Sequence, residues 1–187
     1  MLELKLNVNA ELTNVNFRKE FHGEAHVTAV DMNFKAQINQ SLADHFCLDD
    51  EFFSDGLWRD NEDGEIVVRF PQMGAFAIGM VFENHEIKLL SPVRTDDTAL
   101  LVLKERKVGK VKMHPKNGGV ADISFQVQGN ISDPATVGQL VTDLLGRELV
   151  LIIQPQQADL VSEMNAEPDA ATILAREQSK IAAGAKR

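Results

Sequence analysis

The chain has 187 residues, of which 44% are hydrophobic and 25% are charged, which is typical of a globular domain with a real core. A single cysteine, Cys47, excludes an intramolecular disulfide and with it the class of small disulfide-stapled secreted domains. No stretch approaches the roughly 20 apolar residues of a membrane helix, and the N-terminus lacks the pattern of a signal peptide. We therefore expect a cytoplasmic protein with no membrane partner.

The formal net charge is −9, but the charges are distributed unevenly along the chain. Residues 43–65 contain nine acids and one base; the acids are Asp44, Asp49, Asp50, Glu51, Asp55, Asp60, Glu62, Asp63 and Glu65. Residues 104–116 contain six bases and one acid; the bases are Lys104, Arg106, Lys107, Lys110, Lys112 and Lys116. Runs of like charge are most often solvated surface, so either segment becomes a binding candidate only if its charges gather in space.

The N-terminal part alternates between apolar and polar residues, as half-buried strands do. Residues 3–15 begin with this alternation, and residues 26–38 keep it throughout. A short helix is predicted for residues 41–46, with Ser41 as its N-cap. The acidic stretch that follows, up to Glu65, is predicted to be a loop that Trp58 anchors to the core.

The middle of the chain predicts four further strands. Residues 65–70 form one that stops at Pro71, because proline cannot continue a strand. Residues 76–82 and 85–90 resemble a hairpin that turns at Glu83-Asn84. Residues 99–103 are expected to continue the sheet.

The strongest local signal lies at residues 108–127. Two alternating segments flank Asn117-Gly118, a dipeptide that supplies the positive φ angles of a tight turn, so we predict a β-hairpin. Asp133 and Pro134 then open a helix as N-cap and first-turn residue, and Gly146 suits its C-terminus. A strand over residues 148–153 ends at Pro155.

These elements predict a mainly β, α+β fold: an antiparallel sheet, sandwich or barrel-like domain with one or two short helices. The globular domain spans residues 1–154, either as one unit or as two similar halves, 1–48 and 66–154, joined by the acidic loop. Residues 155–187 are expected to be a tail that is flexible, or helical against a partner. The predicted core comprises Leu6, Val30, Met32, Phe34, Ile38, Val67, Phe70, Phe82, Leu101, Ile123, Phe125, Val127, Leu140, Leu144 and Ile152.

Catalytic and metal-binding motifs are weak. His22 and His26 have a spacing that metal sites use, with His45 and Cys47 downstream, but no second tight pair supports a site. A calcium loop placed on Gly64 would put non-ligating residues at its first and last positions. Glycine-rich nucleotide loops and the nucleophile elbow are missing from the sequence. We expect a non-enzymatic protein with no cofactor and no metal.

The basic segment is the leading candidate site. Lys104, Arg106, Lys107, Lys110, Lys112 and Lys116 line a predicted strand and its approach, and such a ribbon can follow a phosphate backbone. We therefore expect binding to nucleic acid or a nucleoprotein, although single-strand binding also needs stacking aromatics, which this segment lacks. The alternative is a protein–protein interaction module that acts through the acidic loop or the tail. Its candidate residues are Asp49, Asp50, Glu51, Asp60, Glu62 and Asp63.

Two segments resemble a family of uncharacterised bacteriophage and prophage proteins. They are residues 14–24 with 29–34, and Val111-Lys-Met-His-Pro-Lys-Asn-Gly-Gly119 with 122–127, followed by the last helix and strand. The resemblance implies a phage or prophage origin, and with it a phage accessory protein in the host cell. The charged segments leave nucleic acid, a host protein and a phage protein as the candidate partners. The resemblance implies no catalytic residues, and it leaves homo-oligomerisation and a place in the virion open.

Overall fold

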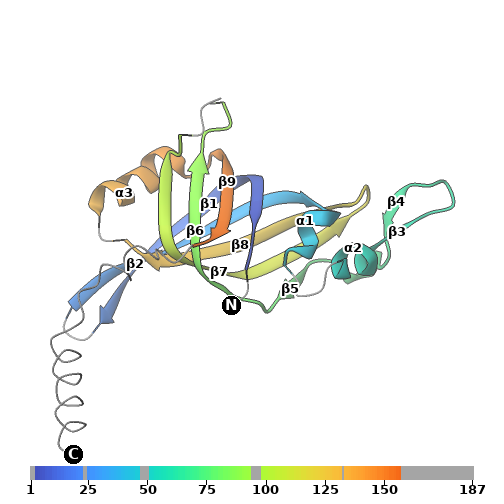
Figure 1. The fold of residues 1–187 in the computed structure, drawn as a ribbon, viewed down its shortest axis with the longest axis horizontal. Coiled ribbons are helices and arrows are strands. Elements are labelled where there is room, and N and C mark those ends of the chain that lie inside the picture. Colours follow the sequence, from blue (N-terminus) through green and yellow to red (C-terminus); the bar gives the residue numbers. More distant parts are fainter. Residues whose placement is uncertain (1–2, 23–24, 47–50, 94–97, 132, 157–187) are drawn as a thin grey trace, which may run out of the picture. The chain divides into compact units, whose positions relative to one another are not determined.

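Nine strands make up most of the part of the chain that this computed structural model describes, residues 3–22, 25–46, 51–93, 98–131 and 133–156 (Figure 1). The strands are β1 (Leu6–His22), β2 (Ala25–Asn39), β3 (Trp58–Asp60), β4 (Ile66–Val68), β5 (Phe76–Ile78), β6 (Phe82–Leu90), β7 (Leu101–Lys116), β8 (Val120–Asn130) and β9 (Glu148–Pro155). The helical segments are α1 (Gln40–Asp44), α2 (Phe52–Leu57), η1 (Pro71–Met73), α3 (Pro134–Gln139) and η2 (Leu140–Leu144). The predicted mainly β fold class is confirmed; residues 157–187 of the predicted tail lie outside the described residues.

Six of these strands close into an antiparallel barrel. Their order is β7-β6-β9-β1-β2-β8, and β8 pairs with β7 to complete the ring. Closure pairs the backbone groups that an open sheet would leave at its two edges. The short strand β5 pairs with β7 at residues 111–113, beyond the part of β7 that β6 covers.

The apolar side of the alternating strands fills the barrel. Phe34 on β2 and Phe125 on β8 are cross-strand partners whose ring centroids lie 5.7 Å apart, and both side chains are buried. Such aromatic pairs stabilise a sheet beyond the burial of their area. Most of the predicted core is confirmed as buried: Leu6, Val30, Met32, Phe34, Ile38, Phe82, Ile123, Phe125, Val127, Leu140 and Leu144. Val67, Leu101 and Ile152 are only half-buried.

Connections outside the ring pack at its two ends, with α3 at one and β3–β4 at the other (Figure 1). The indole Nε1 of Trp58 donates to the carbonyl of Lys116 at 2.8 Å, and Trp58 is 1% exposed, so its predicted anchoring role is confirmed. Asp133 accepts hydrogen bonds from the backbone N–H groups of Ala135 and Thr136, as predicted for the N-cap of α3. Leu140 and Leu144 of η2 then pack into the core.

Several local predictions are wrong. Residues 76–90 form no hairpin, since β5 and β6 both pair with β7; the Glu83-Asn84 signal reflects a positive φ of 57° at Asn84 inside β6. The N-cap of α1 is Asn39, whose Oδ1 accepts from Leu42 N–H, and not Ser41. The acidic stretch contains α2 and β3 as well as loop.

The turn between β7 and β8 lies where the sequence predicted it, but its positive φ angles are at Gly118 and Gly119 and not at Asn117 and Gly118. Gly118 and Gly119 have φ angles of 84° and 68°, while Asn117 does not have a positive φ. The Asn117 side chain instead accepts a hydrogen bond from Val68 N–H at 3.0 Å. The Asn117 side chain, which was predicted to form the turn, therefore binds β4 to the tip of the β7–β8 hairpin.

Candidate nucleic-acid interface

Two bulges in β7 decide where the six predicted cations point. The inward-facing residues Leu103, Val108 and Val111 are not evenly spaced, because Glu105 and Lys110 adopt positive φ angles of 56° and 51°. Each bulge inserts one residue and so shifts the alternation by one position. As a result Lys104, Lys107, Lys112 and Lys116 are exposed, Lys110 is exposed at the second bulge, and Arg106 shares the phase of Val108.

Arg106 is withdrawn from the predicted ribbon. Its guanidinium lies over Gly129, where a Cβ would come within 2.1 Å of Nη1, and it donates to the carbonyl of Asn130. Its Nε is buried without a partner among the described residues. Burial lowers the pKa of Arg106, as expected for a cation removed from water. This side chain therefore cannot line a phosphate track in the conformation seen.

Two further cations of the predicted ribbon are paired with acids. Lys107 lies 3.5 Å from a carboxylate oxygen of Glu83 on β6. Lys116 forms an ion pair with Asp122 on β8, and this hydrogen bond is the main reason why the pKa of Asp122 is lowered. Exposed pairs of this kind are weak and can exchange partners. They nevertheless reduce the local excess of positive charge.

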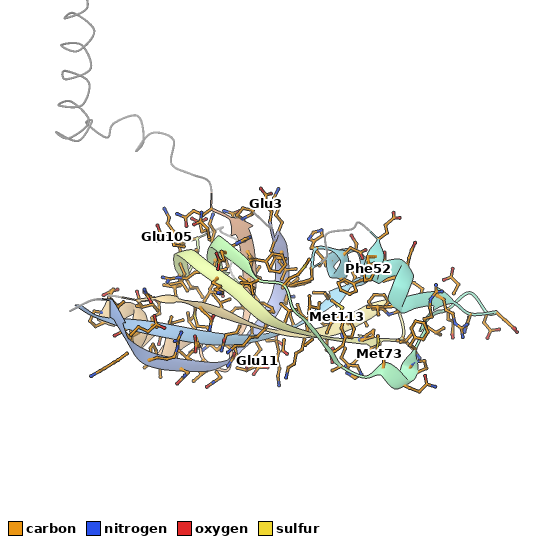
Figure 2. The ribbon with its side chains drawn as sticks, turned by 90° about the horizontal axis from the view of Figure 1, so that it is seen from below. Glu3, Glu11, Phe52, Met73, Glu105 and Met113 are labelled. Carbon is orange, nitrogen blue, oxygen red and sulfur yellow. The ribbon has the colours of Figure 1, made fainter. Side chains whose placement is uncertain are left out.

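The outer face of β1, β2, β8 and β7 forms an open groove of about 690 Å³. Its floor is a cross-strand row defined by the register: Glu148 on β9, Glu11 on β1, Lys35 on β2, Ser124 on β8 and Lys112 on β7. Met113 of β7, which Figure 2 labels together with Glu11 of β1, also contributes to the lining, although its side chain is buried. The groove thus gathers residues that lie more than a hundred positions apart in the sequence.

Charge is segregated along that row. Lys35 and Lys112 flank Ser124, so their strands lie two spacings, or about 10 Å, apart. Neither lysine forms an ion pair or side-chain hydrogen bond with a described residue. Glu11 lies directly beside Lys35 in this row, and Glu148 follows it on β9. The β2–β8–β7 side can accept anionic groups, whereas the β1–β9 side repels them.

A polar network borders this groove further along the same face. Gln126, which is 8% exposed, receives a hydrogen bond from Gln128 and donates one to Asn33. Gln128 also donates to Asp31, which pairs with Arg18 and thereby raises the pKa of that guanidinium. Such a satisfied network fixes side chains in place. The network therefore orders its own side chains on the outer face, and it does not include Lys35 or Lys112.

A second hollow, of about 220 Å³, adjoins the groove. It is lined by Phe70 and Pro71 on one side and by His114 and Lys116 of β7 on the other, and His114 lines both hollows. Phe70 was predicted to lie in the core but is 54% exposed. The prediction fails because β4 ends at Val68, so the alternation that would have buried Phe70 stops before it.

The acidic candidates lie apart from this groove's lining. Glu51 precedes α2, while Asp60, Glu62 and Asp63 are exposed at the β3–β4 hairpin. Asn61 Oδ1 accepts from the N–H groups of Asp63 and Glu65, which orders that turn. Asp49 and Asp50 lie outside the described residues.

Metal-ligating residues do not gather in the described part of the chain, where no group of three or more His, Cys, Asp or Glu side chains could hold an ion. His45 is engaged by the carbonyl of Lys5. The side chains of His22, His26 and Cys47 lie outside the described residues, so the weak motif they form stays a sequence observation.

Of the predicted site residues, the structure brings Lys112 into the groove and Lys116 to the adjoining hollow. Sequence reasoning missed Lys35, whose only signal was its place on the polar side of the 26–38 alternation.

Among the helices that the structure describes, none is long and apolar enough to cross a membrane. Comparison of this chain with protein families, curated proteins and solved structures finds no match in any of the three.

Proposed function

We propose that this protein is a non-enzymatic nucleic-acid-binding protein that holds a phosphate backbone against the β2–β8–β7 side of the outer groove. The observation that carries the proposal is the pair of unpaired lysines, Lys35 and Lys112, set about 10 Å apart on a rigid barrel whose chain is otherwise strongly acidic. The sheet fixes only the backbone position of each lysine, and the exposed side chain still loses rotamer freedom when it meets a phosphate. The barrel therefore supplies the positioning and the lysines supply the charge.

The acids of the groove define the path of the polymer. Phosphates that approach Glu11 and Glu148 are repelled, so the backbone is expected to run along β7 and β8 and not across the whole face. Lys110, exposed at the bulge next to this path, adds a further unpaired cation. The proposed interface is thus narrower than the predicted ribbon and differs from it by including Lys35 and excluding Arg106.

A salt series with a fluorescein-labelled oligonucleotide tests the proposal. Each groove lysine that contacts a phosphate releases counterions, so Lys35→Ala or Lys112→Ala should reduce the slope of log K against log salt by about 0.7 for a single strand. Lys19→Ala is the matched control, because Lys19 is exposed on β1 outside the groove. Equal effects of all three variants, or no salt-dependent binding by the wild-type protein, would refute the assignment.

Removing negative charge from the groove gives an independent test in the opposite direction. Glu11→Gln should raise affinity about twofold at low salt, the effect in water of one unit charge two strand spacings, or about 10 Å, from β8. Glu148→Gln should raise it less, because β9 lies three spacings from β8. Glu62→Gln on the β3–β4 hairpin removes the same charge away from the groove's lining and should change little. A larger gain for Glu62→Gln would place the bound polymer elsewhere.

A second candidate function is binding of a basic protein partner through the β3–β4 hairpin. It is favoured by the ordered turn at Asn61, which presents Asp60, Glu62 and Asp63 as exposed acids. Replacing these three acids with their amides should abolish salt-sensitive binding of a polylysine probe while leaving the barrel folded. Unchanged polylysine binding would eliminate this surface as the interface.

A further inference from the structure

Phe70 is an aromatic side chain held outside the core by fixed backbone on both sides. Before it, Arg69 N–H donates to the carbonyl of Leu57 at 2.8 Å, and its guanidinium donates to the carbonyl of Asp55 at 2.9 Å. After it, Pro71 begins η1, and Met73 N–H donates to the carbonyl of Phe70 at 3.0 Å. The exposed ring is therefore displayed by an ordered turn, and it stacks on no other ring of the described chain.

The surroundings of Phe70 are apolar on one side and cationic on the other. Pro71 extends the apolar surface, whereas Lys116 and His114 form the facing wall of the 220 Å³ hollow. Lys112 lies two residues from His114 on the same outward face of β7, within the larger groove. Asp122, which lines the larger groove, forms an ion pair with Lys116, and the exposed acids of the β3–β4 hairpin lie at the same end of the barrel (Figure 1).

An occupant that suits this hollow must be flat, partly apolar and attached to negative charge. An apolar protein segment would bury the charged Lys116–Asp122 pair and the polar ring of His114, which costs free energy. An unpaired nucleobase offers a π-face to Phe70, while its phosphate falls on the lysine side. Base–aromatic stacking tolerates every base, because all bases have such a face.

We propose that Phe70 is the stacking platform for an unpaired base, which makes the groove selective for single-stranded nucleic acid. This inference rests on the proposed function, since the lysines of the groove supply the backbone contact. In a duplex the bases are stacked on each other and their faces are inaccessible, so Phe70 adds nothing there. The basic segment itself lacks a stacking aromatic side chain. Phe70, which lies 42 positions before Lys112 in the sequence, provides it.

The test measures the fluorescence anisotropy of labelled oligothymidylate and of a labelled hairpin duplex with the full chain. Phe70→Ala should weaken oligothymidylate binding by about 5- to 150-fold, the range for loss of one stacked base, and leave duplex binding unchanged. Phe70→Trp should retain the affinity, whereas Phe70→Leu should lose it, because leucine is apolar but has no π-face. Phe52→Ala is the matched control, since Phe52 is 56% exposed on α2.

Each contrary result has a distinct meaning. If Lys112→Ala weakens binding but Phe70→Ala does not, the stacking inference is overturned and the proposed function stands. If Phe70→Leu binds like the wild type, the hollow holds an apolar group and not a base. If Phe70→Ala instead dissociates a dimer in sedimentation, the occupant is a second copy of this chain. If the wild-type protein binds neither probe, both the inference and the proposed function fail.

Discussion

His85 ties the N-terminal strand to β6 from inside the barrel, and its protonation should weaken the fold. The side chain is 1% exposed. Its Nε2 accepts a hydrogen bond from Leu4 N–H at 2.9 Å, and its Nδ1 lies 2.8 Å from the carbonyl of Glu83. Only the neutral ring with its proton on Nδ1 satisfies both contacts. Burial lowers the pKa of His85, outweighing the Glu83 carbonyl and the charge of Glu3, which both raise it.

Acidification should therefore favour unfolding. In the unfolded chain the imidazole takes up a proton near its ordinary pKa of about 6.5, whereas the folded chain keeps it neutral to lower pH. The unfolded state then binds more protons, so the free energy of unfolding decreases as the pH falls below that value. The decrease between pH 7.5 and 5.5 is at most about 1.4 kcal/mol, the limit reached when the folded ring stays neutral over that whole range.

Urea unfolding followed by Trp58 fluorescence at those two pH values measures this difference. His85→Gln keeps an acceptor for Leu4 and a donor for Glu83 but cannot titrate, so on acidification it should lose less unfolding free energy than the wild type, by up to about 1.4 kcal/mol. His114→Gln, which replaces an exposed histidine, is the control and should retain the wild-type pH dependence. Identical pH dependence in His85→Gln and the wild type would refute the argument.

Two further changes test contacts that organise the barrel. Gly129→Ala should displace the guanidinium of Arg106 and cost about 1 kcal/mol of unfolding free energy, but almost nothing in an Arg106→Ala background, which removes the atoms that the new Cβ would meet. Additive effects in this double-mutant cycle would contradict the contact. Asn39→Ala removes the N-cap of α1 and should lower the free energy of unfolding by about 1 kcal/mol, whereas Ser41→Ala should change it little. Chemical denaturation measures both values, and the reverse order would contradict the assignment of Asn39 as the cap.

The sequence predicted best what local chemistry determines. A period of two identified β2 and β8, and Asp133 with Pro134 identified the start of α3. These features depend on neighbours a few residues apart, so one segment contains the whole signal. The closed order of the barrel has no such signal, because β9 lies between β6 and β1 through contacts that span most of the chain.

Sequence patterns misled where a strand bends without ending. Asn84 in β6 and Lys110 in β7 both adopt positive φ angles inside strands. Asparagine is also a common turn residue, so the sequence pattern predicts a turn at Asn84. A lysine gives no sign of a bulge, so the pattern predicts an unbroken alternation through Lys110. The first error produced a hairpin that does not exist. The second placed Arg106 on the same face as its lysine neighbours.

The candidate interface shows why charge counted along a chain is a poor guide to charge on a surface. A ribbon of cations in sequence runs parallel to a strand, but the groove is organised perpendicular to it, in rows that cross from β9 to β7. Within such a row Lys35 is as close to Lys112 as two strand spacings allow, while Lys104 lies eight residues, or about 26 Å, along β7 from Lys112. The register of β2 against β8 therefore creates the proposed site: a one-residue slip would turn Lys35 to the inner face and remove one of the two unpaired cations that define the phosphate path.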